Sequence, residues 1–132
     1  GMINYMLAVV IDDAQQSVNQ IVRGLDILPL TIPQMVIADY LNFPPNQYYY
    51  HLPILVNAQG QKLSKQTLAE PIHAYPAPQL IKTALQLLQQ PPVDLDKPTT
   101  MLEQAVCQWN HTPLQGKQRI KVDSLQNLLA TH

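Results

Sequence analysis

Cysteine and glycine are scarce in this sequence of 132 residues, and their scarcity excludes several kinds of site. The one cysteine, Cys107, can form neither an internal disulfide nor a zinc site, and it fits a reducing compartment. The four glycines form no Gly-rich loop of the kind that cradles phosphates. The histidines are not spaced as metal ligands, so we expect no metal site; they are His51, His73, His111 and His132.

Charge and long hydrophobic runs are also lacking. Only 13% of the residues are charged and the formal net charge is -1, so the sequence lacks the general basic field of a stand-alone nucleic-acid-binding domain. Any nucleic-acid contact is then local, or comes from another part of a larger protein. No apolar run approaches the roughly 20 residues needed to span a bilayer, and no signal-peptide pattern is visible. The 46% of hydrophobic residues are enough for one packed core.

Three short segments carry the pattern of β-strands. Residues 7–11 are apolar and rich in β-branched side chains, which predicts a buried strand, and residues 18–22 predict a second short strand. Residues 49–56 predict a third strand, although Pro53 restricts it to an edge or to irregular pairing. Residues 57–60 (Asn-Ala-Gln-Gly) predict a turn directly after this strand.

Helical spacing dominates the rest of the chain. A helix is predicted after Thr31, which can cap it, and another from Pro78 to Gln90. Residues 100–103 read as a capping box, and the apolar stripe that follows comprises Leu102, Ala105, Val106 and Trp109. A last helix is predicted over residues 124–130, after a brief basic patch at Lys117, Arg119 and Lys121. This order predicts an incomplete α/β layer followed by a helical appendage.

Three polar groups are candidates for a site, and each has a simpler structural interpretation. Asp12 and Asp13 end a predicted strand and would point to opposite faces, so a solvated strand end or turn cap is favoured over a metal site. Arg23 ends an apolar strand and needs an anionic partner, either Asp26 or a ligand carboxylate; the residues alone leave both open. The Lys-Leu-Ser-Lys stretch at residues 62–65 suits a phosphate site, but four residues alone favour a solvated loop.

The order of these segments along the chain is a more specific family signal than any single segment. The segments YMLAVVIDD, IVRGLDIL and YYYHLPILVNAQGQKLSKQ, taken in this order, resemble the second half of a glutamyl-tRNA synthetase-type catalytic domain. Lys62-Leu63-Ser64-Lys65-Gln66 is similar to the KMSKS signature of class I aminoacyl-tRNA synthetases. The resemblance runs from about Tyr5 to Gln90, and more loosely to His111. The tail LEQAVCQWNHTPLQGKQRI resembles the short tail of the glutamyl-queuosine tRNA(Asp) synthetases, which lack an anticodon-binding domain.

The resemblance implies a fold, a reaction and a set of site residues. The expected fold is the C-terminal half of a Rossmann-like class I catalytic domain with its KMSKS-type loop over residues 1–70, followed by a helical region over residues 71–132. The expected reaction is that of a cytoplasmic ligase, which activates glutamate with ATP and Mg²⁺ and transfers it to the queuosine base of tRNA(Asp). Tyr5 and Arg23 match glutamate-binding positions of the family, and Lys65 matches the lysine that acts on the ATP triphosphate.

The sequence also departs from the family's pattern. A HIGH-like motif, an Arg and Glu that bind substrate, and a zinc-binding insertion precede these segments in the family, and the 132 residues contain none of them. We therefore expect a C-terminal portion that is inactive by itself. Two alternatives stay open: a fragment of a glutamyl-tRNA synthetase proper, and a non-catalytic module. Such a module would form a homodimer through its exposed half-sheet or pair with a separate N-terminal half.

Overall fold

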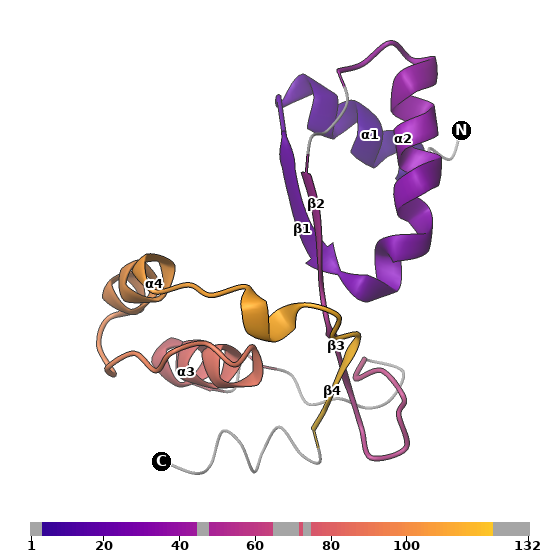
Figure 1. Ribbon diagram of the computed structural model, residues 1–132. Coiled ribbons are helices and arrows are strands. Elements are labelled where there is room, and N and C mark those ends of the chain that lie inside the picture. Colours follow the sequence, from indigo (N-terminus) through magenta and orange to yellow (C-terminus); the bar gives the residue numbers. More distant parts are fainter. Residues whose placement is uncertain (1–3, 45–47, 65–71, 73–74, 123–132) are drawn as a thin grey trace. The chain divides into compact units, whose positions relative to one another are not determined.

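The computed structural model describes residues 4–44, 48–64, 72 and 75–122 of the chain (Figure 1). Its contacts divide the chain into two compact units, residues 1–52 and residues 53–132. The predicted boundary after residue 70 lies outside the described residues and stays a prediction, and so does the helix predicted over residues 124–130. Within the described part, no helix combines the length and apolar character that a membrane crossing requires.

The first unit begins with a helix where the sequence predicted a strand. Residues 7–11 lie inside α1 (Tyr5–Gln15), so the predicted strand is wrong. Asn4 caps this helix, because its side-chain oxygen accepts a hydrogen bond from the backbone N–H of Met6 at 3.0 Å. Val10 is the one residue of α1 that is buried, and the rest of the apolar run is half-buried or exposed.

A two-stranded parallel sheet forms the other layer of the first unit. β1 (Gln20–Gly24) confirms the second predicted strand, two residues further along, and pairs with β2 (Tyr48–Leu52). The 3-10 helix η1 (Leu25–Leu30) and α2 (Thr31–Tyr40) connect the two strands, and α1 packs against α2 (Figure 1). A parallel pair with its crossover helix agrees with the predicted α/β class.

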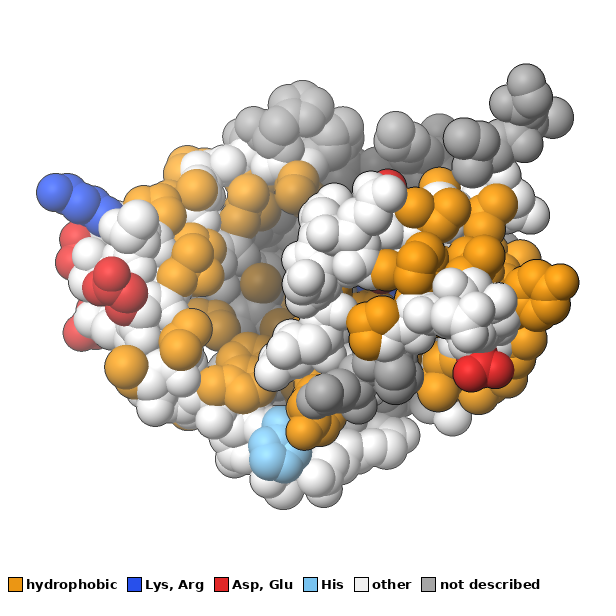
Figure 2. Space-filling model, turned by 90° about the horizontal axis from the view of Figure 1, so that it is seen from above, with side chains coloured by type: hydrophobic (Ala, Val, Ile, Leu, Met, Phe, Trp, Pro, Cys, Tyr) orange, Lys and Arg blue, Asp and Glu red, His pale blue; other side chains and the backbone are white. Residues whose placement is uncertain are grey.

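One face of this sheet is open. Val22 on β1 and its neighbours Tyr48 and Tyr50 on β2 are 62%, 50% and 52% exposed, and the two tyrosine rings stack with centroids 6.4 Å apart. Parallel sheets are normally covered on both faces, so this one is unusual in water. The outer face of α2 is also apolar, with exposed Ile32 and Val36, and Figure 2 shows hydrophobic side chains reaching the surface at many places.

The second unit starts with a strand that Pro53 separates from β2. β3 (Ile54–Val56) pairs in parallel with β4 (Arg119–Lys121), and Val56 also forms an antiparallel bridge with Lys62 on its other side. The predicted third strand is therefore two strands with a break at the proline, which has no N–H for a ladder. The region after residue 70 was predicted to be helical; β4 shows that it also contributes a strand.

Two helices carry the core of the second unit. α3 (Ala77–Leu87) confirms the helix predicted from Pro78, and α4 (Pro98–Cys107) packs against it. The short η4 (Thr112–Leu114) follows. The core cluster, with Ile81 packed against it, consists of Leu85, Val93, Met101 and Ala105.

One prediction about α4 was wrong and another holds only in part. The helix begins at Pro98 with Lys97 as its N-cap, so the predicted capping box at residues 100–103 lies inside the helix. The predicted apolar stripe is confirmed at Ala105, which is buried, whereas Leu102, Val106 and Trp109 are exposed. Met101 lies four positions before Ala105 on the same face of the helix, and these two residues contribute to the core cluster.

Candidate functional site

The side chain of Arg23 is held in a network of neutral hydrogen-bond partners within the first unit. Its Nε donates to Nε2 of His51 at 3.2 Å, its Nη1 to Oε1 of Gln34 at 2.6 Å, and its Nη2 to Oγ1 of Thr31 at 2.7 Å. The guanidinium carbon lies 5.4 Å from the centroid of the Tyr49 ring, within range of a cation–π interaction. Three hydrogen bonds and one ring contact thus hold the Arg23 side chain in place.

The elements of the first unit bring these partners together. Arg23 and His51 are register neighbours on β1 and β2, and Thr31 and Gln34 lie on the first turn of α2. Positions three apart share one face of a helix, so both α2 side chains reach the same guanidinium. Thr31, predicted to cap α2, is instead its first helical residue, and Leu30 occupies the N-cap.

Two aspartates of the first unit bear on the charge of Arg23: Asp26, close to it in the sequence, and Asp13 on α1. Asp26, the structural partner considered from the sequence, is not among its three hydrogen-bond partners. Burial raises the pKa of the Asp13 carboxyl on α1, and the nearby Arg23 charge lowers it. The effect of burial is larger, so the pKa of Asp13 is raised overall. Asp12 and Asp13 lie in the last turns of α1 rather than at a strand end, which corrects the earlier prediction.

His51 must be neutral where it accepts the Arg23 hydrogen bond. The Nε–H group of arginine can only donate, so Nε2 of His51 carries the lone pair and its proton lies on Nδ1. Burial, and then the nearby Arg23 charge, lower the pKa of His51 from its usual 6.5. The Thr31 hydroxyl oxygen lies 3.2 Å from the same ring nitrogen, so these groups form one connected network.

Tyr5 lies apart from this network. It is the first residue of α1 and is 55% exposed. Among the described residues no hydrogen bond or ring contact joins it to Arg23. The structure therefore places both predicted glutamate-binding residues in one unit without direct contact between them.

The lysine motif follows a turn in the second unit. The Asn57 side chain builds this turn: its Oδ1 accepts from the N–H groups of Gln59 and Gln61 at 3.1 and 2.9 Å. Gly60, with a φ of 78°, completes the turn predicted from the sequence. Lys62 then bridges to Val56, and the backbone N–H of Leu63 donates to the carbonyl of Leu55 at 2.9 Å.

The rest of the motif is only partly described. Leu63 and Ser64 are half-buried, whereas Lys65 and Gln66 lie outside the described residues. The described groups thus anchor the start of the motif to β3 and its hairpin. The roles predicted for the five motif residues stay predictions.

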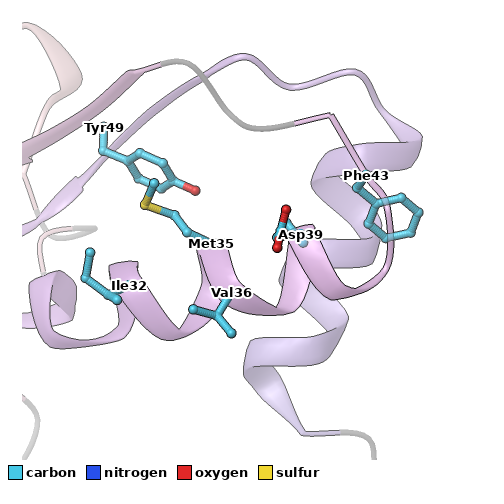
Figure 3. Close-up of a pocket in the computed structure, with 7 residues that line it drawn as sticks. Ile32, Met35, Val36, Asp39, Phe43 and Tyr49 are labelled. Atoms are coloured by element: carbon cyan, nitrogen blue, oxygen red, sulfur yellow. The ribbon is translucent and has the colours of Figure 1, made fainter.

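A pocket of about 390 Å³ in the first unit adjoins the arginine through Tyr49 (Figure 3). Its walls are mostly apolar, with Met35 next to Tyr49, and its one charged lining residue is Asp39. A carboxylate among apolar walls disfavours an anionic ligand. This pocket is therefore a poor place for glutamate, and the polar chemistry of the unit lies at Arg23. In the described ranges no three His, Cys, Asp or Glu side chains gather as a metal site.

The sequence profile of the family described as "tRNA synthetases class I (E and Q), catalytic domain" matches residues 1–85 of the chain. The chain belongs to this family. Among curated proteins it is 50% identical over 119 residues to the glutamyl-Q tRNA(Asp) synthetase of Acinetobacter baylyi, covering 89% of this chain and 40% of that relative. The enzyme of the same name from Neisseria meningitidis serogroup B is 45% identical over 107 residues, covering 80% of this chain and 36% of the relative.

A third relative extends the match along the chain. The glutamyl-Q tRNA(Asp) synthetase of Shewanella frigidimarina is 35% identical over 127 residues, which are 96% of this chain and 43% of that protein. The chain thus spans about two fifths of the length of these relatives. The predicted resemblance to glutamyl-Q tRNA(Asp) synthetases is confirmed.

Sequence reasoning found Arg23 but missed the residues that hold it. Thr31 was assigned to a helix cap, His51 to a set of unrelated histidines, and Gln34 was not singled out. A signal was available: Thr31 and Gln34 stand at helical spacing just after the VRG segment, so one turn of α2 can present two acceptors to Arg23.

Proposed function

We propose that this chain is part of a glutamyl-Q tRNA(Asp) synthetase, which activates glutamate with ATP and transfers it to the queuosine base of tRNA(Asp). The 50% identity to the Acinetobacter baylyi enzyme of that name, over nearly the whole chain, carries the proposal. The family profile ends at residue 85, before tail residues such as Trp109 and His111. The match to the Shewanella frigidimarina enzyme includes this tail, because it covers 96% of the chain.

In this proposal Arg23 and Tyr5 bind the glutamate substrate. Arg23 is the only Lys or Arg among residues 1–52, and its three hydrogen-bond partners are uncharged. A half-buried guanidinium whose partners are neutral can take a carboxylate in a charge-assisted hydrogen bond. The Tyr5 hydroxyl adds a second polar contact from the start of α1.

The lysine motif acts on ATP. Lys65 stabilises the negative charge that grows on the pyrophosphate as it leaves, and Lys62 with Leu63, Ser64 and Gln66 forms the loop that carries it. Mg²⁺ would arrive with the ATP phosphates, because it is usually held by phosphates and one or two carboxylates rather than by a protein cage.

Aminoacylation assays with the full-length protein that contains this sequence test the proposal. We expect labelled glutamate to attach to tRNA(Asp) that carries queuosine, and not to tRNA(Asp) with an unmodified guanine at that position. Transfer of glutamate to tRNA(Glu) instead would show a glutamyl-tRNA synthetase proper. Absence of glutamate activation in the full-length protein would favour the non-catalytic module.

A further inference from the structure

We propose that Gln34, together with Thr31 and His51, is a positioning residue that holds the Arg23 guanidinium in one orientation and leaves its positive charge available to the amino-acid substrate. The inference rests on the proposed function, because it requires that Arg23 binds a carboxylate of glutamate. It adds a separate claim to that function: because the three partners are neutral, Arg23 remains able to bind an anion.

The hydrogen bonds fix the plane of the guanidinium. Each of its three nitrogens donates one hydrogen bond to a different residue, at 3.2, 2.6 and 2.7 Å. A guanidinium has five N–H bonds, so these three hydrogen bonds use only one N–H of each terminal nitrogen, and in this inference the second one receives the anion. Three contacts from one neighbouring strand, β2, and one helix, α2, restrict rotation about the side-chain bonds of Arg23, and this reduces the entropy lost when a ligand binds.

Of the three partners, Gln34 gives the strongest support for a positioning role. It is 2% exposed, and its Oε1 must face Arg23 because the guanidinium only donates. Its Nε2 is consequently buried and has no hydrogen-bond partner in the described part of the chain. A buried donor without a partner destabilises a fold, so glutamine is a poor choice here for packing alone. The acceptor that it offers to Arg23 explains its presence.

The charge of the partners decides what Arg23 can bind. A glutamate at position 34 would keep the shape and the acceptor, but it would place a carboxylate where Oε1 now lies, 2.6 Å from Nη1. Arg23 would then be neutralised internally, as buried arginines usually are. A substrate carboxylate would have to compete with this permanent partner and approach its negative charge.

The test is a KM comparison by glutamate-dependent ATP–pyrophosphate exchange in the full-length protein. We expect Gln34→Glu to raise the KM for glutamate by about tenfold or more, with the KM for ATP unchanged. Gln34→Met, which removes the acceptor without adding charge, should raise it less. Gln20→Glu is the matched control: it adds the same charge on an exposed position of β1, on the opposite face from Arg23, and should change neither KM.

A double-mutant comparison separates positioning from a general structural effect. If Gln34 acts through Arg23, Gln34→Met should add nothing to the defect of Arg23→Ala. Additive effects, or a Gln34→Glu enzyme with the KM of the unmodified protein, would overturn the inference. Thermal unfolding of each variant identifies a protein that has simply lost its fold. Such a protein would lose maximal exchange rate, because less folded enzyme is present, without a selective rise in the KM for glutamate.

The substrate role of Arg23 and the positioning role of Gln34 are refuted by different results. An unchanged KM for glutamate in Arg23→Ala would remove Arg23 from the substrate site, and the proposed role of Arg23 would fall together with this inference. A raised KM in Arg23→Ala, combined with no effect of Gln34→Glu, would leave the substrate role intact and overturn only the positioning role.

Discussion

Arg23 and His51 are direct neighbours across the β1–β2 pair, and the Nε–H of the arginine donates to Nε2 of the histidine at 3.2 Å. The bond can exist only while His51 is neutral, since protonation would place an N–H group on each side of the contact. Two strands are thus joined by a side-chain bond that breaks when its acceptor is protonated.

Stability should therefore fall in mild acid. Burial lowers the pKa of folded His51 from its usual 6.5, so the unfolded chain binds this proton more tightly than the folded one. The stabilisation is complete above about pH 6.5 and is lost as the pH falls through the folded pKa. Denaturant unfolding at several pH values should show this decline, and His51→Gln should flatten it relative to the unmodified chain. An equal slope in both proteins would contradict the prediction.

Substitution of Arg23 should affect one substrate more than the other. In the full-length protein, Arg23→Ala removes a charge-assisted hydrogen bond worth roughly 1.5–3 kcal/mol, so the glutamate requirement should rise about ten- to hundredfold. The ATP requirement should change little. Arg23→Lys should rescue only in part, because an ammonium group cannot bond Thr31, Gln34 and His51 at once. Equal effects on both substrates would mark Arg23 as a structural residue.

Lys65 should act on the transition state. In the full-length protein, Lys65→Ala should lower the rate of glutamate activation by about two orders of magnitude, by analogy with the loss of one preorganised electrostatic donor. The affinity for ATP should hardly change, because the charge on the pyrophosphate grows only as the bond breaks. Pyrophosphate exchange over a range of ATP concentrations measures both. Recovery of the rate at saturating ATP would contradict a transition-state role, and Lys62→Ala should have a smaller effect.

The open face of the sheet should cause self-association of the 132-residue chain. Val22 and Tyr50 are 62% and 52% exposed, side by side on β1 and β2. Burying such apolar area against a second copy is favourable. Light scattering should show species larger than a monomer at high concentration, and Val22→Lys with Tyr50→Lys should reduce them. Val106→Lys, at a 75% exposed position of α4, is the control. A clean monomer mass for the unmodified chain would refute the prediction.

The sequence predicted most elements after residue 18, and the reason for the early error is physical. Residues 7–11 have the β-branched composition of a buried strand, but Asn4 supplies a helix cap and the run lies within the eleven residues of α1. Five apolar residues cannot distinguish a buried strand from the middle of a longer helix. The cap three residues earlier was the stronger signal.

The site was predicted in part. Arg23 and the lysine stretch stood out from the residues themselves, and the resemblance added Tyr5 and the roles of all three, whereas Gln34 and the contacts of Thr31 and His51 came only from the structure. Neutral side chains acquire their importance from what they contact, and Gln34 contacts Arg23 because η1 brings the first turn of α2 within reach of the Arg23 side chain. A single sequence gives the spacing of α2 but not the place where it packs.

The pairing of β3 with β4 has a consequence for biosynthesis. Leu55 pairs with Ile120, 65 positions later, while the hairpin that brings Lys62 to Val56 needs only its own turn. A hairpin closes within about 1–10 μs, but a ribosome that adds about 5–20 residues per second needs several seconds to deliver β4. During those seconds the strand before the lysine motif has one unpaired edge. The nascent chain should therefore need shielding, by a chaperone or by the ribosome surface, until β4 emerges.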